Sequence, residues 1–418
     1  MTHAFLAVVI FTLTIAAIVF LAGRISEWKT ALIGAGLMLL CGILTPSTAA
    51  ATVLSQWDVL LFFGGLATIV AAAEEARMFS WLSQLAAHFA NGSERRLYLA
   101  VVCIAALVTI FLTNDAAVLF MIPLVARLVQ ELGLRVLPFA LAVAFIANAA
   151  SALLPISNPT NFIVAHTAGL TLFSYLREVG LPSLAAAVTT MVFLWVFFGS
   201  RMRERYDPNN LKGVRAPSLA FGLTLAFIAA AMVVASALRF PVGIVAAVGG
   251  IALIVILGIE SKKNALETVR GANLSLVVFV ASLFVVVAGL RQSGVLEAPT
   301  RLLAETLRTH VADAAPLSAL FMAIASNLVN NLPMSMIAVQ MLQHDAFSQN
   351  IAARFTGGAI VGLAIGANLT PIGSLSTILV RISLRRAGLE IPLRAYVIPG
   401  VIVTALTLLV ASVAFLYQ

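Results

Sequence analysis

Two proline-containing stretches decide the fold: LLPISNPTN at residues 153–161 and NLTPIGS at residues 368–374. Each interrupts an apolar segment that is otherwise long enough to cross a membrane, residues 135–168 and residues 351–384. Proline has no backbone N–H to donate and restricts the residue before it, so an α-helix cannot continue unchanged through either stretch. We therefore predict two transmembrane helices that are unwound in the middle.

Each broken helix is preceded by a pair of short apolar arms around a polar tip. Residues 97–131 carry Thr113-Asn114-Asp115 between arms of about 16 and 12 residues, and residues 312–344 carry a tip at 329–333. A helix needs roughly 20 apolar residues to span the hydrocarbon core. The arm length therefore favours two re-entrant hairpins, with tips near the middle of the membrane, over two pairs of full spans.

The two sets of interruptions share one spacing. Asn114 and Asn330 are 216 positions apart, and so are Pro155 and Pro371. Two separate irregularities at one offset indicate an internal duplication, which is common in transporters. We expect a first repeat at residues 1–200 and a second repeat at residues 218–418. A polar cytoplasmic linker at residues 201–217 joins them.

The composition agrees with this interpretation. The chain has 418 residues, of which 61% are hydrophobic and 10% charged, and its mean hydropathy is +1.07. Soluble domains carry about 25% charged residues, so a soluble, disordered or fibrous protein is excluded. The apolar runs are continuous rather than alternating, which argues against a membrane β-barrel. The sequence predicts an all-α polytopic membrane protein.

The basic residues define a topology. With three helices, a broken helix and a final helix in each half, the connectors on one face carry 19 of the 25 Lys and Arg residues. The positive-inside rule makes that face cytoplasmic and places both termini in the periplasm. An odd number of spans per half makes the two repeats inverted. The net charge of +8 therefore reflects membrane topology, and we expect no nucleic-acid partner.

Irregular backbone at membrane depth persists only where it lines a cavity, because unpaired backbone groups are costly in lipid. Inverted symmetry brings the four interruptions together, so they predict a site for a small solute. The alternative is that the prolines only kink helices and the asparagines only hold helices together. The candidate solute-binding residues are amides and hydroxyls: Asn114, Ser157, Asn158, Thr160, Asn161, Asn330, Asn331, Asn368, Thr370 and Ser374.

Asp115 is the one acidic residue predicted at membrane depth, and an intramembrane carboxylate is a candidate proton carrier or cation ligand. It could also cap a helix N-terminus. Asn148 and Glu75 are accessory candidates, although Glu75 also fits an exposed place at the membrane interface. Sequence motifs for a nucleotide, a metal or a catalytic nucleophile are absent. We therefore expect a transporter driven by a proton gradient, with no cofactor and no metal site, rather than an enzyme.

Five motifs resemble the arsenite permease (arsenical pump membrane protein) family of the ion transporter superfamily. They are TNDAAVLFMIPLV at 113–125, LPISNPTNFIVA at 154–165, VVAGLRQSGVL at 286–296, NNLPMSMIAV at 330–339 and NLTPIGSLSTIL at 368–379. The resemblance implies a bacterial inner-membrane protein that exports arsenite or antimonite in exchange for protons, in some members with a soluble ATPase subunit. It also implies an elevator-type fold, in which a hairpin-containing unit moves against a scaffold.

Other functions remain open from the residues. A sodium/proton antiporter would need more buried carboxylates than this chain offers, whereas a carboxylate symporter would use helix N-termini and hydroxyls, which are present. An ion channel would not need inverted halves with broken helices, and an intramembrane enzyme would need a nucleophile or metal cluster. We expect an arsenite/antimonite:proton antiporter.

Overall fold

The protein is helical throughout the part of the chain that the structure describes. The computed structural model describes residues 2–207, 211, 213–261, 268, 270–386, 388–390 and 392–417. Within them, eight helical segments are long and apolar enough to cross a membrane, and extended pairing is limited to an isolated bridge between Ser93 and Arg205. The predicted all-α polytopic membrane protein is confirmed. The predicted linker at 201–217 includes residues 208–210 and 212, which lie outside the described residues.

The first repeat contains both predicted irregular features. The hairpin consists of α6 as one arm and α7, η1 and α8 as the other, and the broken helix consists of α9, η2, η3 and α10. In chain order the elements are α1 (Thr2–Phe20), α2 (Glu27–Leu40), α3 (Pro46–Ser55), α4 (Trp57–Glu75), α5 (Met78–Phe89), α6 (Glu94–Phe111), α7 (Asn114–Ala116), η1 (Ala117–Met121), α8 (Ile122–Glu131), α9 (Val136–Ala150), η2 (Ser151–Leu153), η3 (Pro155–Ser157), α10 (Pro159–Thr167), α11 (Leu172–Tyr175), η4 (Leu176–Gly180) and α12 (Leu181–Phe197), followed by the short turn η5 (Gly199–Arg201).

The second repeat follows the first at the predicted offset. Here α18 and α19 form the hairpin, and α20, η7 and α21 form the broken helix; η3 and η7 are separated by 216 positions. The elements are α13 (Leu219–Leu238), α14 (Val242–Ser261), α16 (Ser275–Gln292), α17 (Glu297–Thr309), α18 (Ala314–Val329), α19 (Asn331–Leu342), α20 (Gln349–Gly366), η7 (Pro371–Gly373), α21 (Leu375–Arg386) and α22 (Leu393–Phe415).

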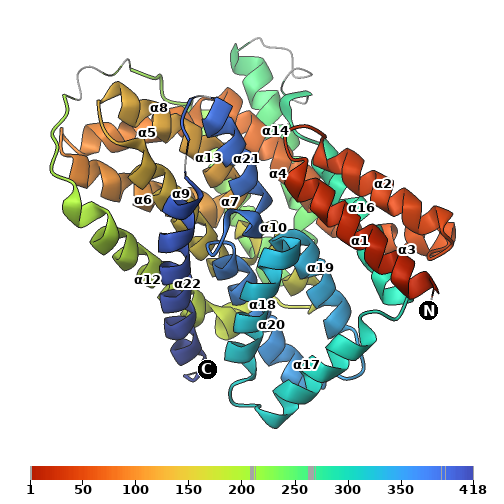
Figure 1. The fold of residues 1–418 in the computed structure, drawn as a ribbon. Helices are drawn as coiled ribbons and strands as arrows, with labels where there is room; N and C mark the ends of the chain where they lie inside the picture. The colour runs from red at the N-terminus through yellow and green to blue at the C-terminus, as the bar shows by residue number, and fades with distance from the viewer. Residues whose placement is uncertain are drawn as a thin grey trace.

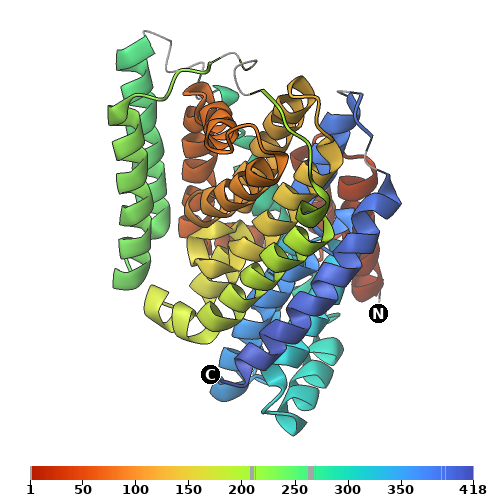
Figure 2. The same cartoon turned by 90° about the vertical axis from the view of Figure 1, so that its left-hand side faces the viewer.

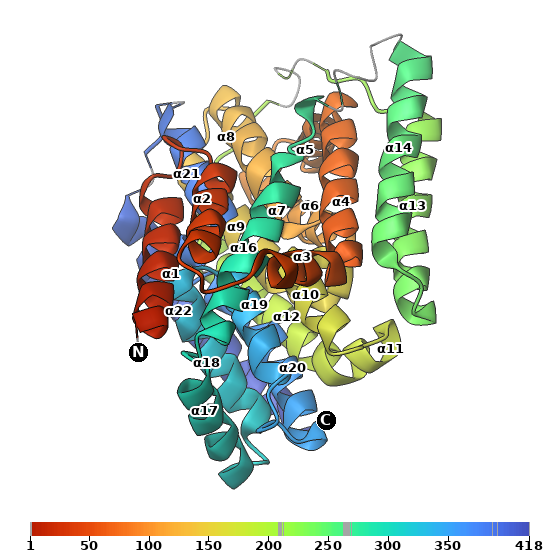
Figure 3. The ribbon, with the colours of Figure 1, turned by 90° about the vertical axis from the view of Figure 1, so that its right-hand side faces the viewer.

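The repeats are inverted and interlocked. The matching helices α5 and α17 lie at opposite ends of the molecule, and both chain ends lie in the half that contains α17 (Figure 1). Packing across the repeats is reciprocal, because α4 packs against α14 while α2 packs against α16. The paired helices α13 and α14 stand along one side of the molecule (Figure 2), and α1 and α2 stand along the other (Figure 3). The last helices of the two repeats, α12 and α22, pack together.

The second helix is shorter than the apolar run that contains it. The run at residues 28–45 predicts a single span, but α2 ends at Leu40 and a separate helix, α3, begins at Pro46. The apolar pattern does not reveal the break because the intervening residues are themselves apolar. The break follows from Gly42, whose φ of +66° ends the helix, and from Pro46, which suits a first helical position.

Candidate functional site: a polar cavity between the hairpins and broken helices

Each of the four interruptions is closed by a side chain that accepts a hydrogen bond from the backbone of the helical turn that follows. Thr113 Oγ1 accepts from Ala116 N at 3.1 Å, and Asn158 Oδ1 accepts from Thr160 N at 3.0 Å. In the second repeat, Asn330 Oδ1 accepts from Leu332 N and Thr370 Oγ1 accepts from Ile372 N, each at 3.3 Å. These bonds satisfy amides that helix starts leave unpaired. Capping therefore occupies part of three predicted solute ligands, Asn158, Asn330 and Thr370.

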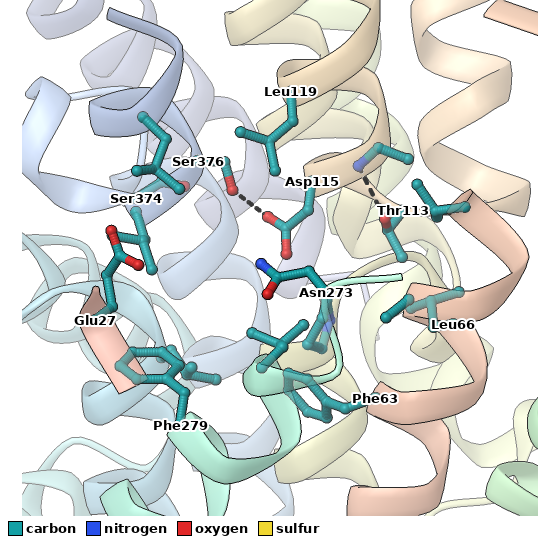
Figure 4. A pocket seen from close by; sticks show the side chains of 18 of the residues that line it. Glu27, Phe63, Leu66, Thr113, Asp115, Leu119, Asn273, Phe279, Ser374 and Ser376 are labelled. Carbon is teal, nitrogen blue, oxygen red and sulfur yellow. Dashed lines mark hydrogen bonds between the residues drawn. The ribbon is translucent and has the colours of Figure 1, made fainter. Parts of the chain in front are cut away.

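The interruptions surround a cavity of about 220 Å³. One wall is polar and comes from the hairpins and broken helices, and the other is mainly apolar and comes from α4 and α16 (Figure 4). The cavity extends to the starts of α2 and α16, where Glu27, Trp28 and Gly271 line it. Five of the predicted site residues line this cavity: Asp115, Asn158, Thr160, Asn331 and Ser374.

Asp115 lies on the polar wall, in the first turn after the hairpin tip. Its carboxylate accepts a hydrogen bond from the Ser376 hydroxyl, which comes from the second repeat. The Asn273 amide faces the carboxylate across the cavity (Figure 4). The capping alternative for Asp115 is wrong, because Thr113 is the residue that caps this helix start. The carboxylate is therefore directed toward the cavity rather than used by the backbone.

The backbone that follows Asp115 is also irregular. Residues Ala117–Met121 form the π-helical turn η1. Pro123 lacks the N–H that would pair with the Leu119 carbonyl, which accounts for a widened turn just before it. Such π-turns are frequent at functional sites.

Three predicted amides lie behind the cavity wall and form a buried chain. Asn114 Nδ2 donates to Asn148 Oδ1 at 3.5 Å, and Asn148 Nδ2 donates to Asn368 Oδ1 at 2.9 Å. Asn368 Nδ2 in turn donates to the Phe145 carbonyl at 3.1 Å. This chain links the first hairpin tip to the second helix break, and none of the three asparagines is among the residues that line the cavity.

Four more predicted ligands, which lie in the breaks and at the second hairpin tip, are hydrogen bonded to neighbouring groups and do not line the cavity. Ser157 Oγ donates to the Ile110 carbonyl at 2.6 Å, and Asn161 Nδ2 donates to the Ser151 carbonyl at 2.7 Å. The other two behave alike: Asn330 Nδ2 donates to the Ile372 carbonyl at 3.0 Å, and Thr370 Oγ1 donates to Asn327 Oδ1 at 2.7 Å. Their geometry is that of groups that stabilise irregular backbone. The accessory candidate Glu75 ends α4 in an exposed position away from the cavity.

Sequence reasoning missed several polar residues that line the cavity: Glu27, Thr113, Asn273, Ser275 and Ser376. A signal existed for Ser376, because it lies 216 positions after the predicted residue Thr160. Glu27 and Asn273 gave no such signal. They precede or begin apolar helices and resemble connector residues until α2 and α16 pack together.

A second polar contact lies near the start of α4, on the side of the broken helix away from its break. Asp58 is buried on α4, and its Oδ1 accepts from Gly243 N of α14 at 2.8 Å. His166 Nδ1, near the end of α10, lies 3.6 Å from Asp58 Oδ2. One turn away, the rings of Phe62 and Phe162 are 4.2 Å apart between centroids. These contacts hold α10 against α4 and α14 at the end opposite to its solute-facing start.

Inverted repeats, hairpin tips and broken helices around one cavity define a membrane transporter of multi-pass type. The chain belongs to the citrate transporter (CitMHS) family, whose sequence profile matches residues 15–355. It is also similar to the arsenical pump membrane protein of Escherichia coli K12, with 28% identity over 98% of this chain and 97% of the relative. The arsenical pump membrane protein of Yersinia enterocolitica is 28% identical over 97% of this chain and 96% of its own length. The resemblance to arsenical pump membrane proteins is confirmed.

The fold has a solved counterpart. The YdaH transporter of Alcanivorax borkumensis, described as having an unusual topology, matches with a TM-score of 0.53 over 86% of this chain and 84% of that protein. The sequences are 18% identical, so this likeness concerns the fold. The predicted helical membrane-protein fold is confirmed, and family and relatives point to a membrane transporter rather than an enzyme.

Proposed function

We propose that this chain is a secondary active transporter that exports trivalent arsenic or antimony hydroxide in exchange for protons. One observation carries the proposal. Among the described residues, the cavity lining contains two carboxylates, several amides and hydroxyls, and no Lys, Arg or His. An uncharged trihydroxide can exchange hydrogen bonds with amides and hydroxyls alone, whereas an anion held away from water needs a positive side chain or free amides at a helix start. Side chains already cap the four helix starts around the cavity.

The charge of the lining separates this proposal from the runner-up functions. A carboxylate symporter, which the family name suggests, would bring a second anion beside Asp115 and Glu27 without a basic residue to meet it. A sodium/proton antiporter would favour several oxygen ligands of negative charge around one point. Glu27 begins α2 while Asp115 lies beyond the hairpin tip, so the inner part of the cavity offers one carboxylate.

The two walls suit an elevator-type movement. The polar wall belongs to the hairpins and broken helices, and α4 and α16 present mainly apolar side chains to it, such as Leu66 and Phe279. A polar unit can slide past such a wall without losing hydrogen bonds at each step. Asp115 would carry the proton in one direction, and the amides and hydroxyls around it would carry the solute in the other.

The proposal includes a place in the cell. We place the protein in the bacterial inner membrane, with both termini in the periplasm and the cavity opening beside Glu27 toward the cytoplasm. The basic connectors support this orientation, and an exporter must load its solute from that side. A soluble ATPase subunit would add a second energy source, but exchange with protons does not require such a subunit.

Everted vesicles test the function directly. Vesicles from cells that express the chain should accumulate arsenite when a pH gradient is imposed, and Asp115→Asn should abolish the gradient-driven part of that uptake. Asp345→Asn, which removes a carboxylate in an exposed turn, serves as the matched control and should transport normally. Uptake of citrate or sodium in place of arsenite would retire this function while leaving the fold intact. Unchanged coupling in Asp115→Asn would remove its assigned role.

A further inference from the structure

Four residues that line the cavity form two pairs that are related by the repeat offset. A shift of 216 positions relates Asp115 to Asn331 and Thr160 to Ser376. All four line the same cavity. Asp115 and Asn331 each follow a hairpin tip, whereas Thr160 and Ser376 each lie in the first turn of the second half of a broken helix. The cavity is therefore built from two symmetry-related pairs, each with one residue from each repeat.

The side chains of one pair are hydrogen bonded to each other, whereas those of the other pair are not. The Ser376 hydroxyl donates to the Asp115 carboxylate. In the other pair, α19 packs against α10, but the described residues include no hydrogen bond between the Asn331 and Thr160 side chains. The Thr160 hydroxyl has only a long 3.5 Å bond to Asn161 Oδ1, and no described residue pairs with the Asn331 amide. Asn331 is 6% exposed and Thr160 is 2% exposed, so both residues are more than nine-tenths buried.

The Asn331 amide has no partner among the described residues and the Thr160 hydroxyl has one long bond, and polar groups in such a buried position are costly unless a ligand meets them. We propose that the two pairs divide the work of the transporter: Asp115 and Ser376 form a proton half-site, and Asn331 and Thr160 form a solute half-site for a neutral polyhydroxide. This division rests on the proposed function. The Asn331 amide can donate and accept at once, and the Thr160 hydroxyl can do the same. The symmetry-related position of Asp115 carries an amide, so the inner site binds a single proton in each cycle.

Other charged groups lie outside the proton half-site. Glu27 is the other titratable side chain in the described cavity lining, at its mouth. Arg381 of α21 is exposed and lines a separate small cavity with Val118 and Ile122. The pH dependence of transport is therefore assigned to Asp115, and Glu27→Gln should leave its shape unchanged.

Transport kinetics should separate the half-sites. Asn331→Ala and Thr160→Val should each raise the KM for arsenite about tenfold, as expected for one lost hydrogen bond to a desolvated ligand, and leave the pH profile in place. Ser376→Ala should leave KM within about twofold and move the profile to higher pH. The serine hydroxyl stabilises the ionised carboxylate, so its removal favours the protonated form. Ser376→Thr keeps the hydroxyl donor and should therefore keep the wild-type profile. A pH shift in Asn331→Ala, or an unchanged KM in both solute variants, would overturn the division.

An infrared pH titration of the purified protein provides a readout that needs no solute. The carboxyl band assigned by its loss in Asp115→Asn should shift in Ser376→Ala and stay in place in Asn331→Ala. Equal shifts in both variants would overturn the proton half-site. If the wild-type protein moves no arsenite, the proposed function fails while this titration still decides whether Asp115 and Ser376 form a separate unit. Size-exclusion profiles identify variants that fail to fold.

Discussion

The two units, each made of a hairpin and a broken helix, have the same order of elements but pack differently. In the second repeat, α20 presents three glycines at four-residue spacing to three alanines of α18. These residues are Gly358, Gly362 and Gly366 facing Ala315, Ala319 and Ala323. A Cβ on any of the glycines would collide with the α18 backbone. Such small-residue stripes let helices approach closely in membranes.

The first repeat has larger residues at the same register. On α9, the positions equivalent to the three glycines of α20 are Ala142, Ile146 and Ala150. On α6, the positions equivalent to the three alanines of α18 are Leu99, Cys103 and Leu107. Leu99 and Leu107 are exposed on the outer surface. The second unit is therefore held by direct backbone contact, while the first unit carries the carboxylate. The duplication kept the breaks and changed the packing.

The largest effect should come from filling the close contact in the second unit. Gly362→Ala would push its Cβ into the Ala319 carbonyl, and overpacking of this kind costs about 3 kcal/mol. We expect a large fall in the thermal unfolding midpoint in detergent and poor recovery of folded protein. Gly222→Ala on α13 is the matched control, because a Cβ there meets no atom within 4 Å. If both variants unfold at the wild-type temperature, the close contact does not support the second unit.

The breaks themselves were predictable because each depends on local covalent chemistry. The predicted tip at 113–115 overlaps the gap at residues 112–113 between α6 and α7 and the first two residues of α7, and the predicted break at 368–374 contains η7. Proline removes a donor wherever it occurs, so its effect can be read from the sequence without neighbours. The offset then indicated a duplication because the same local signals occur twice, and the odd number of spans in each half predicted that the repeats are inverted.

The cavity lining was less predictable because it depends on contacts between repeats. Ser376 reaches Asp115 across 261 positions, and Glu27 reaches the cavity only through the packing of α2 on α16. Asn114 and Asn368 were expected to face the solute, yet they bond to Asn148 behind the wall. An amide near a helix break can cap, bridge or bind, and residue type alone does not choose among these roles.

The hairpin tips offer the next largest contrast. Asn330 has φ +75° and ψ 153°, a conformation that strains any residue except glycine, whereas the equivalent Asn114 is the first residue of a helix. Asn330→Ala loses the bond to the Ile372 carbonyl and the cap on Leu332 N and keeps the strain, so it should destabilise by about 2 kcal/mol. Asn330→Gly loses the same two bonds but relieves the strain and should cost about half as much.

Thermal midpoints of the two Asn330 variants, measured beside Asn114→Ala and Asn114→Gly, check this contrast. At Asn114 the order should reverse, because glycine is less favourable than alanine at a helical position. The same order at both tips would mean that the positive φ of Asn330 has no energetic consequence.

The smallest effect concerns the broken helices, where Ser157 of the first repeat corresponds to Gly373 of the second. Ser157→Ala removes one buried hydrogen bond, from Oγ to the Ile110 carbonyl, and should cost about 1 kcal/mol. The reverse change is not equivalent, because a Cβ at Gly373 would lie 2.9 Å from Asn327 Oδ1 and 3.0 Å from Ala367 Cα. Gly373→Ser should therefore disturb the second break more than Ser157→Ala disturbs the first, which unfolding midpoints of both variants would measure. A similar loss in the two variants would show that the second break tolerates a side chain, and that its glycine reflects the ancestry of the repeat rather than the packing around Asn327.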